Sequence, residues 1–294
     1  MAIIDAHTHH YPEAVFSDPR TWAVERGENH WADCVAPLDG QSIQGWADID
    51  KMLTNMDSAG IEKAVLLGWY WENSQTCEEQ NSWYEQAIQQ HPDRLLAFAS
   101  LNSRDEKSAK QIIESAREKG FCGIGEIHPQ VQGHTLRAPC WQKVMELAAG
   151  MDLPINLHVT EPVGRDYPTK VETPLEDYLW LAEQYPDSKL IYAHWGGLLC
   201  FYELNPAVKK KLANVFYDTA ASPLLYESSI FKRVFDTVGA DRILFGSDYP
   251  LRLYPRRQKE ADFRTYISEI DSLQLDPTDT QSLYYNNFIQ LLEA

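Results

Sequence analysis

Short apolar runs recur along the chain, and each is followed by a stretch in which apolar residues return every three or four positions. The runs are rich in β-branched residues and have the length of strands, whereas the stretches between them have the period of amphipathic helices. Eight runs are expected to form strands: 2–7, 63–69, 94–101, 122–127, 153–159, 189–194, 214–220 and 242–248. Eight alternating strands and helices predict an α/β fold whose parallel sheet closes into a (β/α)8 TIM barrel.

The helical stretches are clearest at 48–60, 108–120, 139–150 and 174–186. Two of them end in glycine, at Gly60 and Gly120, directly before a strand, as expected for a helix cap followed by a short loop. An open doubly wound sheet is the alternative, but no glycine-rich phosphate loop follows the first strand. We expect residues 1–294 to form a single domain, with C-terminal helices over 258–294.

The segment 10–47 departs from this repeat and is rich in Trp, Pro, Gly and Asp. It lies between the first strand and the first helix of the barrel, so it leaves the face where TIM barrels carry their active sites. Its length suits a lid or a wall of the pocket. An insertion without a functional role is the alternative.

The overall charge restricts the partners. Lys and Arg number 26 against 43 Asp and Glu, for a formal net charge of −17. Such a field repels nucleic acid and anionic membrane surfaces. A small anionic substrate is compatible with this charge only if basic side chains gather locally around it.

Targeting signals and cysteine pairs are absent from the sequence pattern. No cationic segment leads into an apolar one at the N-terminus, and no apolar run approaches the roughly 20 residues of a membrane span. The five cysteines are scattered and form no CxxC motif, so we expect reduced thiols that pack in the interior. A cytoplasmic protein is the expectation.

The candidate chemistry begins with DAHTHH at residues 5–10. His7 and His9 are two positions apart at the end of a predicted strand, so their side chains point the same way and can share one metal ion. Imidazole suits zinc and other first-row metals. His10 alternates to the other side and is expected to be a bystander.

Four further residues end later strands in the same manner. They are Glu126, His158, His194 and Asp248. The carboxyl ends of all barrel strands meet at one mouth, so all six side chains are expected to converge there.

At these residues the sequence resembles a known family. DAHTH at the first strand, LPINLH at the fifth, IYAHWGG at the sixth and ILFGSDYP at the eighth are similar to the amidohydrolase superfamily. The similarity is closest to its amidohydrolase-related branch of metal-dependent TIM-barrel hydrolases and decarboxylases. HPDRLLAFASL, at 91–101, is similar to the same branch.

The resemblance implies roles for individual residues. It makes His7, His9, His158 and Asp248 ligands of a catalytic divalent metal, of which Zn²⁺ is the first expectation and Mn²⁺ another. It makes His194 either a ligand of a second metal or the acid/base that orients water. Homodimers are common among such barrels in the family, so the resemblance allows one here.

Glu126 is a departure from the branch. Many of its members have a lysine in a pattern such as GIKLHP, where this chain reads GIGEIHP. The carboxylate is similar to that of two-metal relatives of the TatD type, in which a glutamate on the fourth strand bridges or binds metal. Glu126 therefore allows a binuclear site, and the alternative is a glutamate that hydrogen-bonds a metal-binding histidine.

The expected reaction follows from these groups. A metal held by neutral imidazoles lowers the pKa of bound water from about 15.7 to about 7. Asp248 can accept the proton of that water, and His194 can polarise a substrate carbonyl. The first expectation is a metal-dependent hydrolase of a small carboxylated amide, lactone or ester.

Two alternatives remain open at this stage. A metal-dependent decarboxylase or hydratase of a small aromatic or enoic acid would use the same constellation. A metal-binding barrel without catalysis would be expected to lack some of the ligands, and a TatD-like nuclease is disfavoured by the acidic charge.

Substrate-binding residues are expected after the strands. Arg165 and Arg252 follow the fifth and eighth, and a guanidinium suits a carboxylate, although surface arginines would look the same. Trp69 can wall a pocket or pack against 10–47. His128 can reach the site from its position two residues after Glu126, whereas His30 reads as a loop residue.

Overall fold

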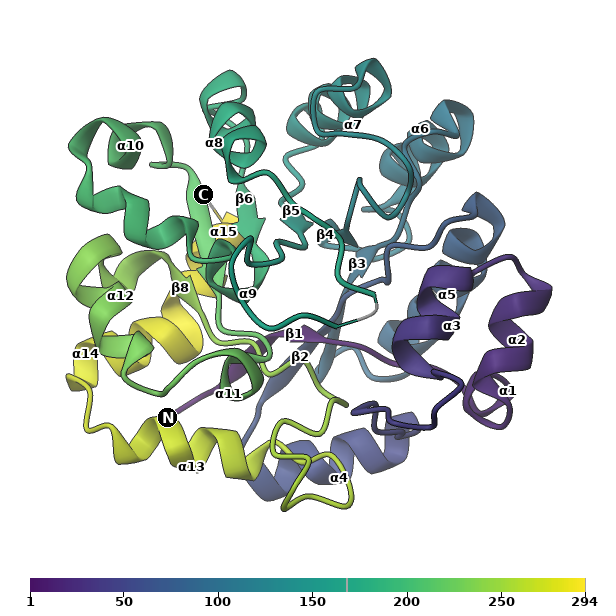
Figure 1. The fold of residues 1–294 in the computed structure, drawn as a ribbon, viewed down its shortest axis with the longest axis horizontal. Coiled ribbons are helices and arrows are strands. Elements are labelled where there is room, and N and C mark those ends of the chain that lie inside the picture. The colour runs from purple at the N-terminus through teal and green to yellow at the C-terminus, as the bar shows by residue number, and fades with distance from the viewer. Residues whose placement is uncertain (168, 294) are drawn as a thin grey trace.

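Eight parallel strands form the centre of the computed structural model, which describes residues 1–167 and 169–293 (Figure 1). Neighbours in the sheet follow chain order from β1 to β8. The strands are β1 (Ile4–Thr8), β2 (Lys63–Leu66), β3 (Leu95–Ala99), β4 (Gly123–Ile127), β5 (Ile155–Leu157), β6 (Leu190–Tyr192), β7 (Val215–Asp218) and β8 (Ile243–Leu244). The TIM-barrel prediction is confirmed, and every predicted run contains its strand, with β1 extending one residue further.

Backbone hydrogen bonds close the sheet between its first and last strands. The N–H of Ala6 donates to the carbonyl of Phe245 at 2.7 Å, and the N–H of Asp248 donates to the carbonyl of His7 at 2.8 Å. Thr8 and Tyr249 form a further parallel bridge. These contacts bring the residues after β8 beside the end of β1, where the first histidines lie.

Helices surround the strands (Figure 1). Their bounds are α1 (Glu13–Phe16), α2 (Pro19–Glu25), α3 (Asn29–Val35), α4 (Ile49–Ala59), α5 (Ser74–Gln90), α6 (Glu106–Ser115), α7 (Pro139–Gly150), α8 (Leu175–Gln184), α9 (Ala193–Gly196), η1 (Leu199–Leu204), α10 (Pro206–Lys211), α11 (Ser222–Leu225), α12 (Ile230–Val238), η2 (Ala240–Arg242), α13 (Arg264–Ser272), α14 (Pro277–Gln281), η3 (Ser282–Asn286) and α15 (Asn287–Glu293). Gly60 caps α4 with φ of 72°, as predicted, whereas α6 ends before Gly120.

The 10–47 insertion folds into α1, α2 and α3, which lie beside α5 at the right of Figure 1. An ion pair between Arg26 and Glu79, 2.9 Å long, ties the end of α2 to α5. Trp22 and Trp31 of the insertion pack on Trp71, with ring centroids 5.5 and 5.6 Å away. The insertion is thus an aromatic layer attached to the segment after β2.

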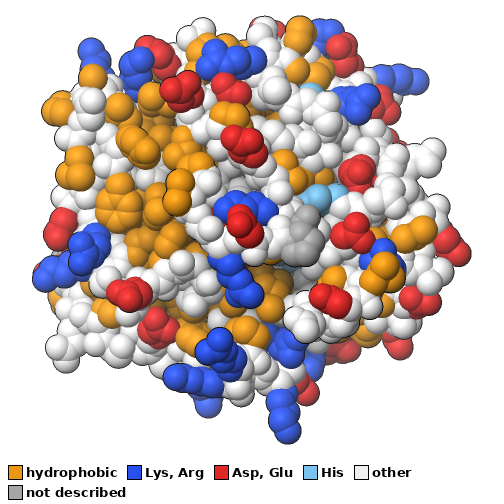
Figure 2. Space-filling view, viewed as in Figure 1, with side chains coloured by type: hydrophobic (Ala, Val, Ile, Leu, Met, Phe, Trp, Pro, Cys, Tyr) orange, Lys and Arg blue, Asp and Glu red, His pale blue; other side chains and the backbone are white. Residues whose placement is uncertain are grey.

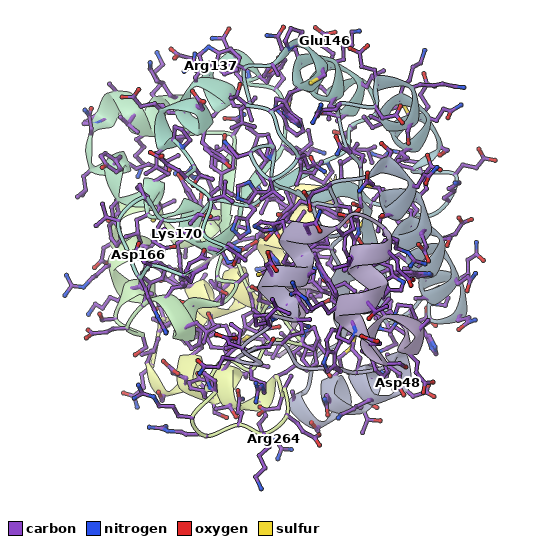
Figure 3. The ribbon with its side chains drawn as sticks, turned by 45° about the vertical axis from the view of Figure 1, so that its right-hand side comes forward. Asp48, Arg137, Glu146, Asp166, Lys170 and Arg264 are labelled. Atoms are coloured by element: carbon purple, nitrogen blue, oxygen red, sulfur yellow. The ribbon has the colours of Figure 1, made fainter. Side chains whose placement is uncertain are left out.

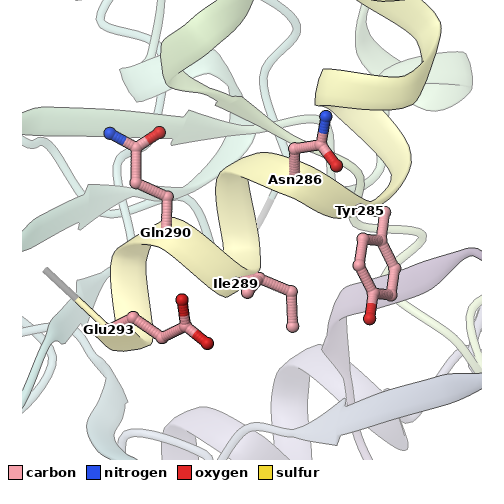
Figure 4. A pocket seen from close by; sticks show the side chains of 5 residues that line it. All are labelled: Tyr285, Asn286, Ile289, Gln290 and Glu293. Atoms are coloured by element: carbon pink, nitrogen blue, oxygen red, sulfur yellow. The ribbon is translucent and has the colours of Figure 1, made fainter.

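The opposite end of the barrel is closed by α15. Phe288 and Leu291 of this helix join a buried apolar cluster with Ile4 and Ala6 of β1. A surface hollow on the outer side of η3 and α15 is lined by Tyr285, Asn286, Ile289, Gln290 and Glu293 (Figure 4). This end, which we call the floor, holds no cluster of metal-binding side chains among the described residues.

None of the helices within the described ranges combines the length and the apolar character that crossing a bilayer requires.

Candidate metal centre

His7 and His9 direct one nitrogen each toward a common point at the end of β1. Their Nε2 atoms are 3.2 Å apart. Nδ1 of His7 donates to Oδ2 of Asp218 at 2.9 Å, and Nδ1 of His9 donates to the carbonyl of Leu67 at 3.0 Å. Because these acceptors fix the proton on each Nδ1, neutral rings leave two facing lone pairs, which suits a cation between them.

Two carboxylates complete this first set of donor atoms. Oδ1 of Asp248 lies 3.3 Å from Nε2 of His9 and 3.9 Å from Nε2 of His7. Oε2 of Glu126 lies 3.6 and 3.8 Å from the same two nitrogens. Ligand atoms bound to one ion at the usual bond lengths are roughly 3 to 3.5 Å apart. The donor set fits a single divalent cation with little movement.

A second set of donors lies on the other side of Glu126. Its Oε1 is 2.8 Å from Nδ1 of His158 and 3.4 Å from Nε2 of His194, and these two nitrogens are 3.2 Å apart. Nδ1 of His194 donates to the carbonyl of Ala220 at 3.0 Å. Glu126 thus presents one oxygen to each set.

The electrostatics of the mouth favour positive charge. Burial lowers the pKa of His194, but the hydrogen bond and charge of Glu126 and the charge of Asp248 outweigh it and raise that pKa to about 9. Burial likewise opposes protonation of His7, but Asp218 and Glu126 raise its pKa well above the ordinary value. The same carboxylates would stabilise a bound cation.

The strand-end positions of His194 and Asp248 differ from the prediction. β6 ends two residues before His194, and β8 ends four residues before Asp248. Both residues have left-handed backbones, with φ of 56° and 68°, a conformation that is costly for side chains with a Cβ. With these turns, Nε2 of His194 lies 3.4 Å from Oε1 of Glu126 and Oδ1 of Asp248 lies 3.3 Å from Nε2 of His9.

The HWGG motif follows from the first of these turns. Gly196 and Gly197 continue the left-handed backbone after His194, with φ of 60° and 55°. A Cβ on Gly196 would lie 2.8 Å from the ring of Tyr217, and one on Gly197 would lie 2.9 Å from the carbonyl oxygen of Thr160. Only glycine meets both requirements at these positions.

The sequence prediction named most of this centre but missed Asp218. Asp218 ends β7 and is fully buried. Besides holding His7, its Oδ1 accepts a hydrogen bond from the backbone N–H of His194 at 2.9 Å, and Oδ2 accepts one from Asn156 at 3.2 Å. The signal was present, because Asp218 ends an apolar run as the six predicted residues do.

Aromatic rings form a wall beside the donors. The ring of Trp69 lies 5.9 Å from that of His9 and stacks on Tyr70 at 4.2 Å. The Tyr70 ring lies 5.2 Å from both His128 and His158. Trp69 and Tyr70 thus adjoin the mouth, while Trp71 packs against the insertion, and the role of Trp69 as a substrate contact stays a prediction.

The two predicted arginines have different surroundings. The guanidinium of Arg252 is hydrogen-bonded to the carbonyl of Ser42 and ties the segment after β8 to the insertion. Arg165 is exposed, on the loop that also carries Asp166 and Lys170, labelled in Figure 3.

Five of the six donor residues are almost inaccessible to solvent, and His158 is partly exposed. His7 is 0% exposed, Glu126 is 2%, His9 is 5%, and His194 and Asp248 are 6% each. Figure 2 shows the side of the molecule onto which the loops after the strands fold, with charged side chains spread across it. Arg137, Glu146 and Arg264 lie at the outer edge (Figure 3). Outer charges of this kind are screened by solvent, whereas the buried donors are not.

Known proteins share this sequence pattern and fold. A gamma-resorcylate decarboxylase from Polaromonas sp. (strain JS666 / ATCC BAA-500) is 22% identical over 290 residues, covering 81% of this chain and 87% of that protein. The structure of 5-carboxyvanillate decarboxylase from Novosphingobium aromaticivorans DSM 12444, with manganese and 4-hydroxy-3-methoxy-5-nitrobenzoic acid, is 17% identical with a TM-score of 0.75. It covers 100% of this chain and 96% of that one.

A dihydroxybenzoic acid decarboxylase from Polaromonas sp. JS666, with bound manganese and 2-nitroresorcinol, is also 17% identical, with a TM-score of 0.72 and coverage of 99% and 97%. The family model described as amidohydrolase matches residues 4–292, nearly the whole chain. The protein therefore belongs to the amidohydrolase family and is an enzyme of that family.

Proposed function

We propose that the protein is a metal-dependent decarboxylase that removes carbon dioxide from a small aromatic carboxylic acid. The supporting observation is the buried convergence of imidazoles and carboxylates beside an aromatic wall, in a chain that is similar over most of its length to several proteins named as decarboxylases of aromatic acids. Hydrolysis, the first expectation from sequence, has less support from these relatives than its decarboxylase alternative.

In this proposal His7, His9, Asp248 and Glu126 would hold the cation. A divalent cation bound there would neutralise the substrate carboxylate and hold it at the mouth. The site is compatible with Mn²⁺, which the two structural relatives contain, and with Zn²⁺. The proposed substrate is a small anion. The cation would neutralise its carboxylate, so an arginine beside that carboxylate is not required.

Decarboxylation requires one proton at the ring carbon that loses the carboxyl group. The carbon–carbon bond breaks, its electron pair stays on the ring carbon, and carbon dioxide leaves. His194 is suited to hold that proton, because its Nε2 lies 3.4 Å from Oε1 of Glu126, and in the metal-free protein Glu126 and Asp248 raise its pKa to about 9. Asp248 stays ionised, because the hydrogen bond to His9 and nearby imidazoles lower its pKa despite burial, so it can orient the reacting groups.

The test is a product assay on the Mn²⁺-loaded and the Zn²⁺-loaded enzyme. A panel of hydroxylated benzoic acids is expected to release carbon dioxide, and lactones and N-acyl amides are expected to remain intact. His194→Gln, which cannot hold a proton of this kind, should lose most of the carbon dioxide release while retaining its metal. Hydrolysis of a lactone or amide without any carbon dioxide release would overturn the proposal.

Hydrolysis is kept as a second candidate because of one observation. Glu126 presents Oε2 to His7 and His9 and Oε1 to His158 and His194, as a carboxylate that bridges two cations would do. Bridged pairs of ions roughly 3.5 to 4 Å apart are typical of hydrolases that activate water. A metal content of two per chain, falling to one in Glu126→Gln, would favour this candidate, whereas one ion in both proteins would remove the support that Glu126 gives it.

A further inference from the structure

Three histidine rings surround Tyr70, and one of them comes from the insertion. His128 follows β4 and His158 follows β5, while His30 lies on α3 with its ring 5.9 Å from that of Tyr70. The sequence pattern gave His30 no role beyond a loop position. The Tyr70 ring lies beside both His30 and His158, so this ring links the insertion to one of the donor residues.

The hydrogen bonds of His30 define which of its nitrogens is free. Its Nε2 is 3.1 Å from the carbonyl oxygen of Thr169, which can only accept, so Nε2 carries the proton. Nδ1 of the neutral ring is therefore an acceptor. This atom is buried and has no hydrogen-bond partner within residues 1–167 and 169–293.

Burial also lowers the pKa of His30, which favours the neutral ring. Leaving a buried nitrogen without a hydrogen-bond partner is unfavourable, so such an atom calls for an explanation. A ligand that donates a hydrogen bond would supply one.

Tyr70 places a second polar group beside His30. The side chain is 4% exposed, and burial raises the pKa of its hydroxyl well above the ordinary value, so the hydroxyl keeps its proton. A phenol hydroxyl donates readily to an oxygen. An acceptor and a donor therefore lie on neighbouring rings next to the candidate metal centre.

We infer that His30 and Tyr70 recognise a hydroxyl group on the substrate, which donates to Nδ1 of His30 and accepts from the Tyr70 hydroxyl. A hydroxyl is the simplest substituent that both donates and accepts. This inference rests on the proposed function in taking the substrate to be an aromatic acid. It adds a specificity-determining residue, His30, that belongs to the insertion rather than to a strand end.

The experiment measures binding rather than turnover. Isothermal titration calorimetry of the Mn²⁺-loaded protein would compare the three monohydroxybenzoates with the three monofluorobenzoates, since fluorine is small and cannot donate. At one ring position the hydroxyl compound is expected to bind about tenfold more tightly, the effect of one good hydrogen bond. In His30→Ala that ratio should fall to about one.

Companion variants separate recognition from folding. His30→Asn keeps an acceptor near the position of Nδ1 and should restore part of the preference. Tyr70→Phe should weaken the hydroxybenzoate several-fold and leave the fluorobenzoate unchanged. Asp33→Asn, on the same helix, removes only the exposed ion pair with Arg20 and should match the wild type, with the metal content of all variants unchanged.

The outcomes distinguish this inference from the proposed function. An equal hydroxyl preference in wild type and His30→Ala, or no preference in the wild type, overturns the role of His30 and leaves decarboxylation standing. A His30-dependent preference without carbon dioxide release from any acid overturns decarboxylation and leaves the recognition standing. Failure of every aromatic acid to bind would overturn both.

Discussion

The two ends of the barrel are built on the same eight strands but bury opposite kinds of side chain. The mouth buries His7, Glu126 and Asp218, whereas the floor buries Phe288 and Leu291 against the strands. Burying an apolar side chain contributes about 1.5–3 kcal/mol to stability. Burying an ionised group costs several kcal/mol unless it is paired. The buried apolar side chains of the floor therefore stabilise the fold, whereas the mouth contains charged side chains that can bind a cation.

The largest expected effect comes from changing the mouth alone. Asp248→Asn keeps the shape of the side chain but removes its charge from the first donor set, so decarboxylation should fall by about 10³-fold or more. Thermal unfolding and circular dichroism should stay close to those of the wild type. Glu13→Gln on exposed α1 serves as the control, and wild-type turnover in Asp248→Asn would refute the site.

A substitution at the floor should lower stability and leave turnover nearly unchanged, which is the reverse of the effect expected for Asp248→Asn. Phe288→Ala removes a buried ring from the apolar cluster and should lower the free energy of unfolding by about 3–5 kcal/mol, as measured by urea denaturation. Turnover per folded molecule should change little, because the mouth lies at the other end of the strands. A large loss of turnover without loss of stability would contradict this division.

A smaller effect is expected from the carboxylate behind the donors. Asp218→Asn weakens the hold on Nδ1 of His7 and on the N–H of His194 without removing a donor. Metal affinity should fall about 10- to 100-fold, measured by competition with a chelator. A metal affinity within twofold of the wild type would show that Asp218 contributes packing alone and does not support metal binding through His7.

The smallest effect tests the hollow on the floor. Gln290 is exposed on α15 and lines that hollow (Figure 4), so Gln290→Ala should change the free energy of unfolding by less than about 0.5 kcal/mol and leave turnover and metal content unchanged. A marked loss of turnover in Gln290→Ala would indicate that the floor takes part in catalysis and would contradict the proposed site at the mouth.

The sequence was sufficient to predict the barrel and the convergence at its mouth, because both depend on periodicity. Apolar runs mark the strands, and polar residues at their ends mark one face. Asp218 obeys the same rule and was predictable in principle.

Other parts of the site depend on contacts that periodicity does not encode. The left-handed turns at His194 and Asp248 follow strands that end earlier than their apolar runs, so the predicted strands extend past β6 and β8. The position of His30 beside Tyr70 follows from how the insertion packs on Trp71. The hydrogen bond between Arg252 and Ser42 is likewise a tertiary contact.

The insertion described above has a consequence for how such an enzyme can change. The metal donors sit on the strands, while His30 sits on a segment that begins after β1 and is held in place by side-chain ties such as those of Arg26 and Arg252. Catalytic power and substrate choice are therefore carried by separable stretches of the polypeptide. New specificities can be explored by varying 10–47, by mutation or by grafting, without rebuilding the machinery underneath.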